Sequence, residues 1–300
     1  MKSVKSIFII TMIMVLQFSF AQTKVSKLFK VHQYASPAGG IFSNSYIIEL
    51  DKSVVVVDGT LLVSTSKILK AKIDSIGKPL VGVLITHGHP DHYNGLGNIV
   101  TKETPIYSTQ SVLNVISKSD AAKEKQWVPM FGDEWPKNRI FPNKPLADKG
   151  SVTFEGVSFT VNEVGAGESD ADTYWAANHK GKKYAFIGDI VLKGVHAYLS
   201  DGHYKEWLTN LETLRPIMNK MKLIYPGHGT IGNSKMFDWQ KGYLDAYLDA
   251  VKRISKGNNT LTDTQKAELV IEMKKYLPND KLEFLIGLGA DVVASKLSIK

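Results

Sequence analysis

The sequence predicts an α/β fold, in which short strands and helices alternate along the chain. Its 300 residues are 43% hydrophobic and 22% charged, values that are ordinary for a soluble globular protein. Short runs rich in Val and Ile alternate in the first half with stretches of helical periodicity. The run Val81–Ile85 is almost continuously apolar, which is typical of a strand covered on both faces. We expect one domain over residues 22–300.

Residues 1–21 have the pattern of a secretory signal peptide. Lys2 and Lys5 precede the apolar stretch Ile7–Leu16, and Ser19 and Ala21 place small residues at the positions that a signal peptidase reads. A transmembrane anchor is the alternative, but the run is shorter than the roughly 20 residues that span a bilayer. No Cys follows, so a lipid anchor on cysteine is excluded. We expect a periplasmic or secreted protein without a membrane anchor.

The first half contains the expected elements in the order hairpin, helix, strand, strand and helix. Their ranges are Gly40–Leu50 with Lys52–Asp58 for the hairpin, then Ser64–Ile76, Val81–Ile85, Pro105–Tyr107 and a helix that begins at Ser111. Residues 119–150 lack a clear period, and their large apolar residues are Trp127, Met130, Phe131, Trp135 and Phe141. We interpret this segment as a long insertion that overhangs the site. Its aromatic residues serve either as anchors of a surface loop or as substrate contacts.

Strands return from residue 151, and a helical segment ends the chain. The strands are expected at Val152–Phe154, Val157–Val161, Thr173–Ala177 and Lys183–Ile187, the last two joined by a turn that starts at His179. Residues 237–300 are predicted to be mostly helical. Their apolar stripe consists of Trp239, Tyr243, Leu244, Tyr247, Leu248 and Val251. Such a stripe indicates core packing rather than a cofactor-binding surface.

Charge and cysteine content exclude several classes of protein. Removal of residues 1–21 takes away two lysines and no acidic residue, so the net charge falls from +8 to +6. The other lysines are scattered, without the clustered basic and aromatic residues of a nucleic-acid interface, so we expect no nucleic-acid partner. Without Cys the exported chain has no disulfides, and Cys is also excluded as a metal ligand.

The most specific signal is the stretch Thr-His-Gly-His-Pro-Asp-His-Tyr-Asn-Gly at residues 86–95. His87, His89, Asp91 and His92 place three imidazoles and one carboxylate directly after the predicted strand Val81–Ile85. Imidazole nitrogens with a carboxylate oxygen are ligands for Zn²⁺ or a similar divalent ion. A solvated loop with chance histidines is the alternative, but it requires four ligand-type residues to coincide.

Three further ligand-type residues follow predicted strands. Asp58, Asp189 and His228 each stand beside a glycine, which lets the backbone pass close by. Alone, each is a weak signal, because an Asp or a Gly-His-Gly after a strand usually belongs to a turn. In this order behind His-x-His-x-Asp-His, they support one another.

Together these motifs resemble those of the metallo-β-lactamase superfamily, over roughly residues 28–235. The resemblance implies a four-layer αβ/βα sandwich, with two sheets face to face, helices outside and a helical C-terminal segment. It also implies two divalent metals at the strand ends. Carried over to this chain, the ligands of the first metal are His87 and His89, those of the second are Asp91, His92 and His228, and Asp189 bridges both. Asp58 would hydrogen-bond a ligand histidine and fix its tautomer.

One position departs from the family's pattern. Glu168, in the segment Gly165–Asp172, stands where the family has a third histidine for the first metal. Its carboxylate either binds that metal, which would suit Mn²⁺ or Fe²⁺ as well as Zn²⁺, or faces away and leaves the first site weak. We favour binding, because Glu is a competent ligand. His179 is a poor substitute, because its predicted hairpin turn lies at the wrong end of the strands.

The resemblance implies a metallo-hydrolase in which two divalent ions, with zinc preferred, hold a hydroxide that attacks the substrate. Asp91 would also be catalytic, by orienting this nucleophile or moving its proton. The family's β-lactamases generally carry Cys or Ser where this chain has Asp189, so we expect a relative of the glyoxalase II-like and lactonase-like hydrolases. The expected substrate is a small lactone, ester or thioester. The alternatives are β-lactam hydrolysis and a metal-binding module without turnover.

We predict that the exported protein begins at Gln22. Cleavage after Ala21 removes the basic start and the apolar run, and intact-mass analysis of the exported protein checks it. A bulky charged residue in Ala21→Arg should block cleavage, because the peptidase reads a small residue there. Recovery of the wild-type chain with residues 1–21 attached would contradict the prediction.

Overall fold

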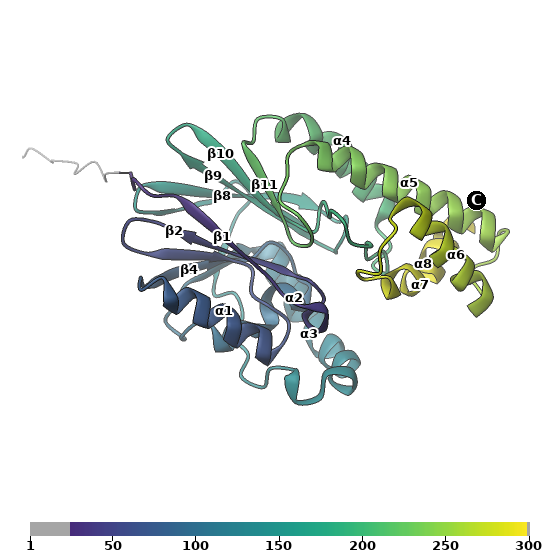
Figure 1. Cartoon of the computed structure of the whole chain (residues 1–300), viewed down its shortest axis with the longest axis horizontal. Helices are drawn as coiled ribbons and strands as arrows, with labels where there is room; N and C mark the ends of the chain where they lie inside the picture. The colour runs from purple at the N-terminus through teal and green to yellow at the C-terminus, as the bar shows by residue number, and fades with distance from the viewer. Residues whose placement is uncertain (1–24, 299–300) are drawn as a thin grey trace, which may run out of the picture.

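Two sheets pack face to face and helices cover their outer faces, as the resemblance implied (Figure 1). The computed structural model describes residues 25–298, so the predicted leader lies outside the described residues. The six-stranded sheet consists, in order, of β1 (Lys30–Ala35), β2 (Asn44–Glu49), β3 (Val54–Val57), β4 (Leu80–Leu84), β5 (Ile106–Thr109) and β6 (Lys144–Leu146). The five-stranded sheet consists, in order, of β11 (Leu223–Pro226), β10 (Lys182–Gly188), β9 (Asp172–His179), β8 (Val157–Gly165) and β7 (Ser151–Phe154).

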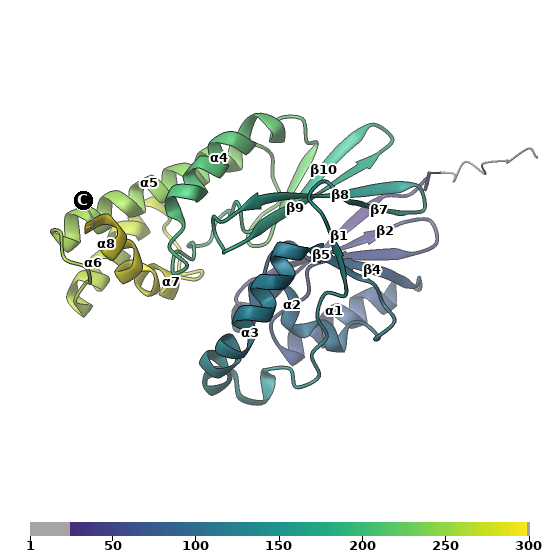
Figure 2. The same cartoon turned by 180° about the vertical axis from the view of Figure 1, so that it is seen from behind.

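The helices form the two outer layers and the C-terminal segment. The six-stranded sheet is covered by α1 (Val63–Ser75) and α3 (Gln110–Phe131), and the short α2 (Pro90–Tyr93) follows β4. The other sheet is covered by α4 (Tyr204–Met218) and α5 (Lys235–Ser255). Packed against α5 are α6 (Asp263–Tyr276) and α8 (Ala290–Ser298), and α7 (Phe284–Leu288) joins them. Figure 2 shows these C-terminal helices on the side of the molecule away from β2.

Alternating burial explains why the strands hold both layers together. In β3, Val55 and Val57 face the second sheet, whereas Val54 and Val56 face α1, and all four are buried. Parallel pairing of β3 with β4 and of β4 with β5 places the carboxyl ends of three strands at one edge of the sheet. Side chains that follow these strands therefore lie together.

Most predicted elements are confirmed, including the hairpin of β2 and β3, the β9–β10 hairpin and the helical C-terminal segment. The predicted break at residue 119 is wrong, because α3 continues to Phe131. Residues 119–125 are mostly good helix formers, and Trp127, Met130 and Phe131 have helical spacing. The exposure of this half of α3 leaves only a weak apolar pattern. No helix within residues 25–298 is long and apolar enough to cross a membrane.

Candidate metal centre

All seven predicted ligands come from loops or helix starts at the strand ends. His87 and His89 lie in the loop after β4, and Pro90 at the first position of α2 starts the turn that carries Asp91 and His92. Asp189 follows β10 and His228 follows β11, which pair in parallel and so end side by side. The structure brings these seven side chains together, and each is at most 8% exposed.

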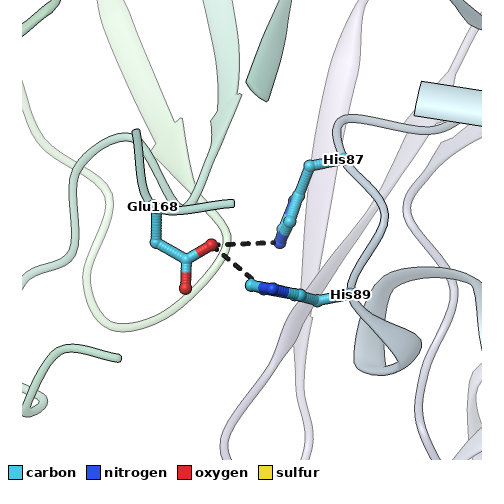
Figure 3. A group of neighbouring side chains, drawn as sticks. All are labelled: His87, His89 and Glu168. Atoms are coloured by element: carbon cyan, nitrogen blue, oxygen red, sulfur yellow. Dashed lines mark ion pairs between the residues drawn. The ribbon is translucent and has the colours of Figure 1, made fainter. Parts of the chain in front are cut away.

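The first group of donors consists of His87, His89 and Glu168 (Figure 3). Glu168 Oε2 lies 3.0 Å from His89 Nδ1 and 3.6 Å from His87 Nε2. The carboxylate therefore points toward the two imidazoles rather than away from them.

The second group consists of Asp91, His92 and His228. Asp91 Oδ2 lies 3.2 Å from His92 Nε2 and 3.0 Å from His228 Nε2. Asp189 lies between the two groups. Its carboxylate is close enough to His87 and His92 for the three residues to share a cation, and its Oδ2 lies 3.2 Å from His228 Nε2. This placement is what a carboxylate shared by two metals requires.

The donor atoms at the centre fit a divalent cation. Within residues 25–298, the buried atoms without a hydrogen-bond partner include Nε2 of His87, Nε2 of His92, Oε2 of Glu168 and Oδ1 of Asp189. Buried polar atoms are normally hydrogen-bonded, so atoms that converge without bonds are typical of a shared cation. Imidazole nitrogens and carboxylate oxygens suit Zn²⁺, Mn²⁺ or Fe²⁺.

The Asp58 carboxylate contacts and orients the His92 imidazole. Its backbone has a left-handed conformation with φ of 58°, which Asp tolerates better than most residues. Its carboxylate accepts hydrogen bonds from the amide and hydroxyl of Thr86 at 2.9 and 2.8 Å, and it lies 3.0 Å from His92 Nδ1. A proton on Nδ1 leaves Nε2 of His92 free to bind a metal, as predicted for Asp58 from the resemblance.

Asp201 orients His89 in the same way, although no sequence pattern pointed to this residue. Its Oδ2 lies 3.0 Å from His89 Nε2, while its Oδ1 accepts a hydrogen bond from the Tyr198 hydroxyl at 3.0 Å. A proton on Nε2 of His89 leaves Nδ1 facing Glu168. Asp201 stands in Ser-Asp-Gly, an ordinary turn sequence, more than a hundred residues from its partner, so no local pattern could have identified it.

His179 has a different role. Its Nε2 lies 2.8 Å from the Ser26 carbonyl oxygen and its ring stacks on Phe29, with ring centroids 5.2 Å apart. It occurs in none of the candidate metal groups found within residues 25–298.

Burial and mutual charge set the protonation of the cluster. Burial raises the pKa of Glu168 to about 8, against the opposing effect of His89. Burial alone would lower the pKa of His228, but Asp189 and Asp91 outweigh it and raise this pKa to about 10. A cation bound here must displace such protons, so metal affinity should fall as the pH falls.

A cavity of about 420 Å³ lies beside the cluster. His89, Asp91, Glu168, Asp189 and His228 form part of its wall. The volume lies within the roughly 300–1,000 Å³ that is usual for small-molecule sites. Side chains of α3 and of the C-terminal segment form another part of the wall, and further lining residues come from the segments 38–41 and 192–198 and from Leu61.

Comparison with known sequences identifies the family. The sequence model of the metallo-beta-lactamase superfamily matches residues 38–228, so the chain belongs to this superfamily. A metallo-beta-lactamase type 2 of Bacillus sp. strain 170 is 23% identical, over 70% of this chain and 73% of that protein. A hydroxyacylglutathione hydrolase of Bdellovibrio bacteriovorus is 25% identical, over 63% of this chain and 64% of that protein. An exodeoxyribonuclease WalJ of Streptococcus pneumoniae is 24% identical, over 65% of this chain and 81% of that protein.

Solved structures agree on the fold. A metallo-beta-lactamase family protein of Thermus thermophilus superposes with a TM-score of 0.62 at 18% identity, covering 87% of this chain and 91% of that one. With the buried donor groups, the family membership identifies the chain as a metal-binding hydrolase. Similar identities to three kinds of hydrolase do not separate them, so the expected kinship with the Asp-bridged hydrolases stays a prediction.

We predict that Asp201→Asn lowers metal affinity about 10- to 100-fold, the usual effect of losing a carboxylate that orients a ligand histidine. Titration with zinc against a chelator of known affinity measures it. Asp238→Asn is the control, because Asp238 is exposed and pairs with Arg215 on the surface. Equal affinity in wild type and Asp201→Asn would show that His89 does not depend on this contact.

Proposed function

We propose that the chain is an exported hydrolase that cleaves small ester-like molecules, namely lactones, esters or thioesters, with two bound divalent metals. The observation that supports this most directly is the donor cluster in the wall of an apolar cavity of about 420 Å³. The N-terminal pattern of residues 1–21 supports export.

In this proposal His87, His89 and Glu168 hold the first metal, while the second is held by Asp91, His92 and His228. Asp189 reaches both. Bound metals of this kind lower the pKa of water and stabilise an oxyanion. Asp91 borders the cavity, so its carboxylate can also orient the attacking water and accept its proton. Zinc is the preferred metal, and Mn²⁺ or Fe²⁺ also suits the oxygen-rich site at Glu168.

The cavity favours a small substrate over a nucleic acid. Apart from the proposed ligands, Lys123 is the only Lys, Arg, Asp or Glu that lines it within the described part of the chain. A nucleic-acid site needs several cations to contact phosphates. The hydroxyacylglutathione hydrolase among the relatives is a precedent in this superfamily for a small-molecule substrate.

Hydrolysis of β-lactams is the second candidate, favoured by the similarity to the Bacillus metallo-beta-lactamase. Asp189 weighs against it, because the family's β-lactamases generally have Cys or Ser at this position. A substrate panel separates the two candidates.

The test uses the mature protein loaded with zinc, assayed on a lactone, an aryl ester, a thioester, a phosphotriester and a cephalosporin. We expect kcat/KM for an ester-like compound to exceed that for the cephalosporin at least tenfold. His228→Ala should lose at least two orders of magnitude, because a metal and its charge stabilisation are lost. His32→Ala, a surface histidine paired with Glu49, is the matched control. Preference for the cephalosporin would establish the second candidate instead.

Glu168 gives a separate prediction about metal content. If its carboxylate binds the first metal, Glu168→Ala should hold about one metal per chain instead of two, whereas Glu168→His should restore the second and favour zinc. Elemental analysis of the three proteins, prepared under the same metal supply, decides the matter. An unchanged metal content in Glu168→Ala would show that residue 168 is not a ligand.

A further inference from the structure

Six of the large apolar side chains that line the cavity come from two segments that are distant from each other in the sequence. The C-terminal half of α3 supplies Trp127, Met130 and Phe131, and the segment around α7 supplies Leu282, Phe284 and Leu285. Neither segment contains a proposed metal ligand. These six residues, called the apolar wall below, therefore serve something other than the metals.

The outer part of the apolar wall reaches solvent. Met130 is 67% exposed and Phe284 is 52% exposed, although both line the cavity. Large apolar side chains on a surface cost free energy and usually mark a binding site when they are continuous with a cavity. Here the cavity leads from these two side chains directly to Asp91, Glu168 and His228.

Half of the apolar wall lies beyond the superfamily match. The match ends at residue 228, whereas Leu282, Phe284 and Leu285 lie more than fifty residues beyond it. Trp127, Met130 and Phe131 lie within the matched range, in the exposed second half of α3. The two segments meet only in space, at the mouth of the cavity.

From this geometry we infer that the substrate carries an apolar acyl chain, which lies along the apolar wall while its carbonyl lies at the metal donors. The inference rests on the proposed function and makes it more specific. Asp91, His228, Trp127 and Phe284 line the same cavity, so an acyl substituent of a carbonyl at the donors can extend toward the apolar wall. None of the six residues of the apolar wall is charged, so a polar or charged acyl group that lies along them would lose its hydration without compensation.

The first experiment measures kcat/KM for the p-nitrophenyl esters of acetate, butyrate and octanoate. A fully buried methylene is worth about 0.8 kcal/mol, or about fourfold in kcat/KM. We expect octanoate to exceed acetate at least tenfold. Phe284→Ser and Met130→Ser should weaken this dependence, because each variant removes apolar surface that only the longer acyl chain would contact.

Ile271→Ser is the matched control. Ile271 is 61% exposed on α6 and does not line the cavity, so its variant should keep the full dependence on chain length. All three replaced side chains are exposed, so the variants should fold. A flat series in the wild type, or an equal weakening in Ile271→Ser, would overturn the inference. Rates that rise with the length of the alcohol instead of the acyl group would also overturn it.

Binding distinguishes failure of the inference from failure of the proposed function. Calorimetry with butyrate and octanoate needs no turnover, and we expect octanoate to bind at least tenfold more tightly, with the difference reduced in Phe284→Ser. Ester hydrolysis without any dependence on chain length would refute the acyl chain but keep the proposed function. Selective binding of octanoate without hydrolysis of any ester would refute the proposed function but keep the apolar chain. Failure of both measurements would refute both.

Discussion

The hydrogen bonds around Thr86 join the two sheets at the point where the site segments meet. Its carbonyl oxygen accepts bonds from the amide and the hydroxyl of Thr173, at 3.1 and 2.6 Å, so the end of β4 is tied to the start of β9. Its own amide and hydroxyl donate to Asp58. Next to Thr173, Asp172 accepts a hydrogen bond from the Glu168 amide at 2.7 Å. These buried hydrogen bonds set the distance from His87 to Glu168, which lie in loops that follow strands of different sheets.

Two glycines let the backbone approach Asp189 and Thr86 closely. A Cβ on Gly227, the residue after β11, would lie 1.9 Å from Asp189 Oδ1, so only glycine lets the backbone approach that carboxylate so closely. Gly188 has φ of 53°, and a Cβ there would lie 2.7 Å from Thr86 Oγ1. Any side chain at either position would move Asp189 or Thr86. The glycines that flank the predicted ligands in the sequence therefore act by keeping the strand ends close together.

Six of the seven donors could be predicted because their signals are local, whereas the four-layer fold and the position of Glu168 were implied by the family resemblance. A strand followed by His-x-His-x-Asp-His is readable within about a dozen residues, and strand periodicity placed Asp58, Asp189 and His228. Other features depend on distant contacts. Asp201 acts on His89 across the fold, β1 mixes polar and apolar side chains, and the second half of α3 is exposed, so none of them has a distinct local pattern. The apolar wall likewise exists only after α3 and α7 meet at the cavity.

The charge of the proposed ligand set bears on the choice of substrate. Asp91, Glu168 and Asp189 would offset three of the four positive charges of two divalent ions, one more than with a histidine at residue 168. A less positive centre attracts an anionic substrate less strongly. Lys123, the one Lys or Arg among the described residues that line the cavity, lies over the Tyr198 ring at 5.6 Å, and the Tyr198 hydroxyl donates a hydrogen bond to the Asp201 carboxylate. The proposed ligand set would therefore attract a carboxylate, such as that of a cephalosporin, less strongly than a set with a histidine at residue 168, which supports the proposal of an uncharged ester as substrate.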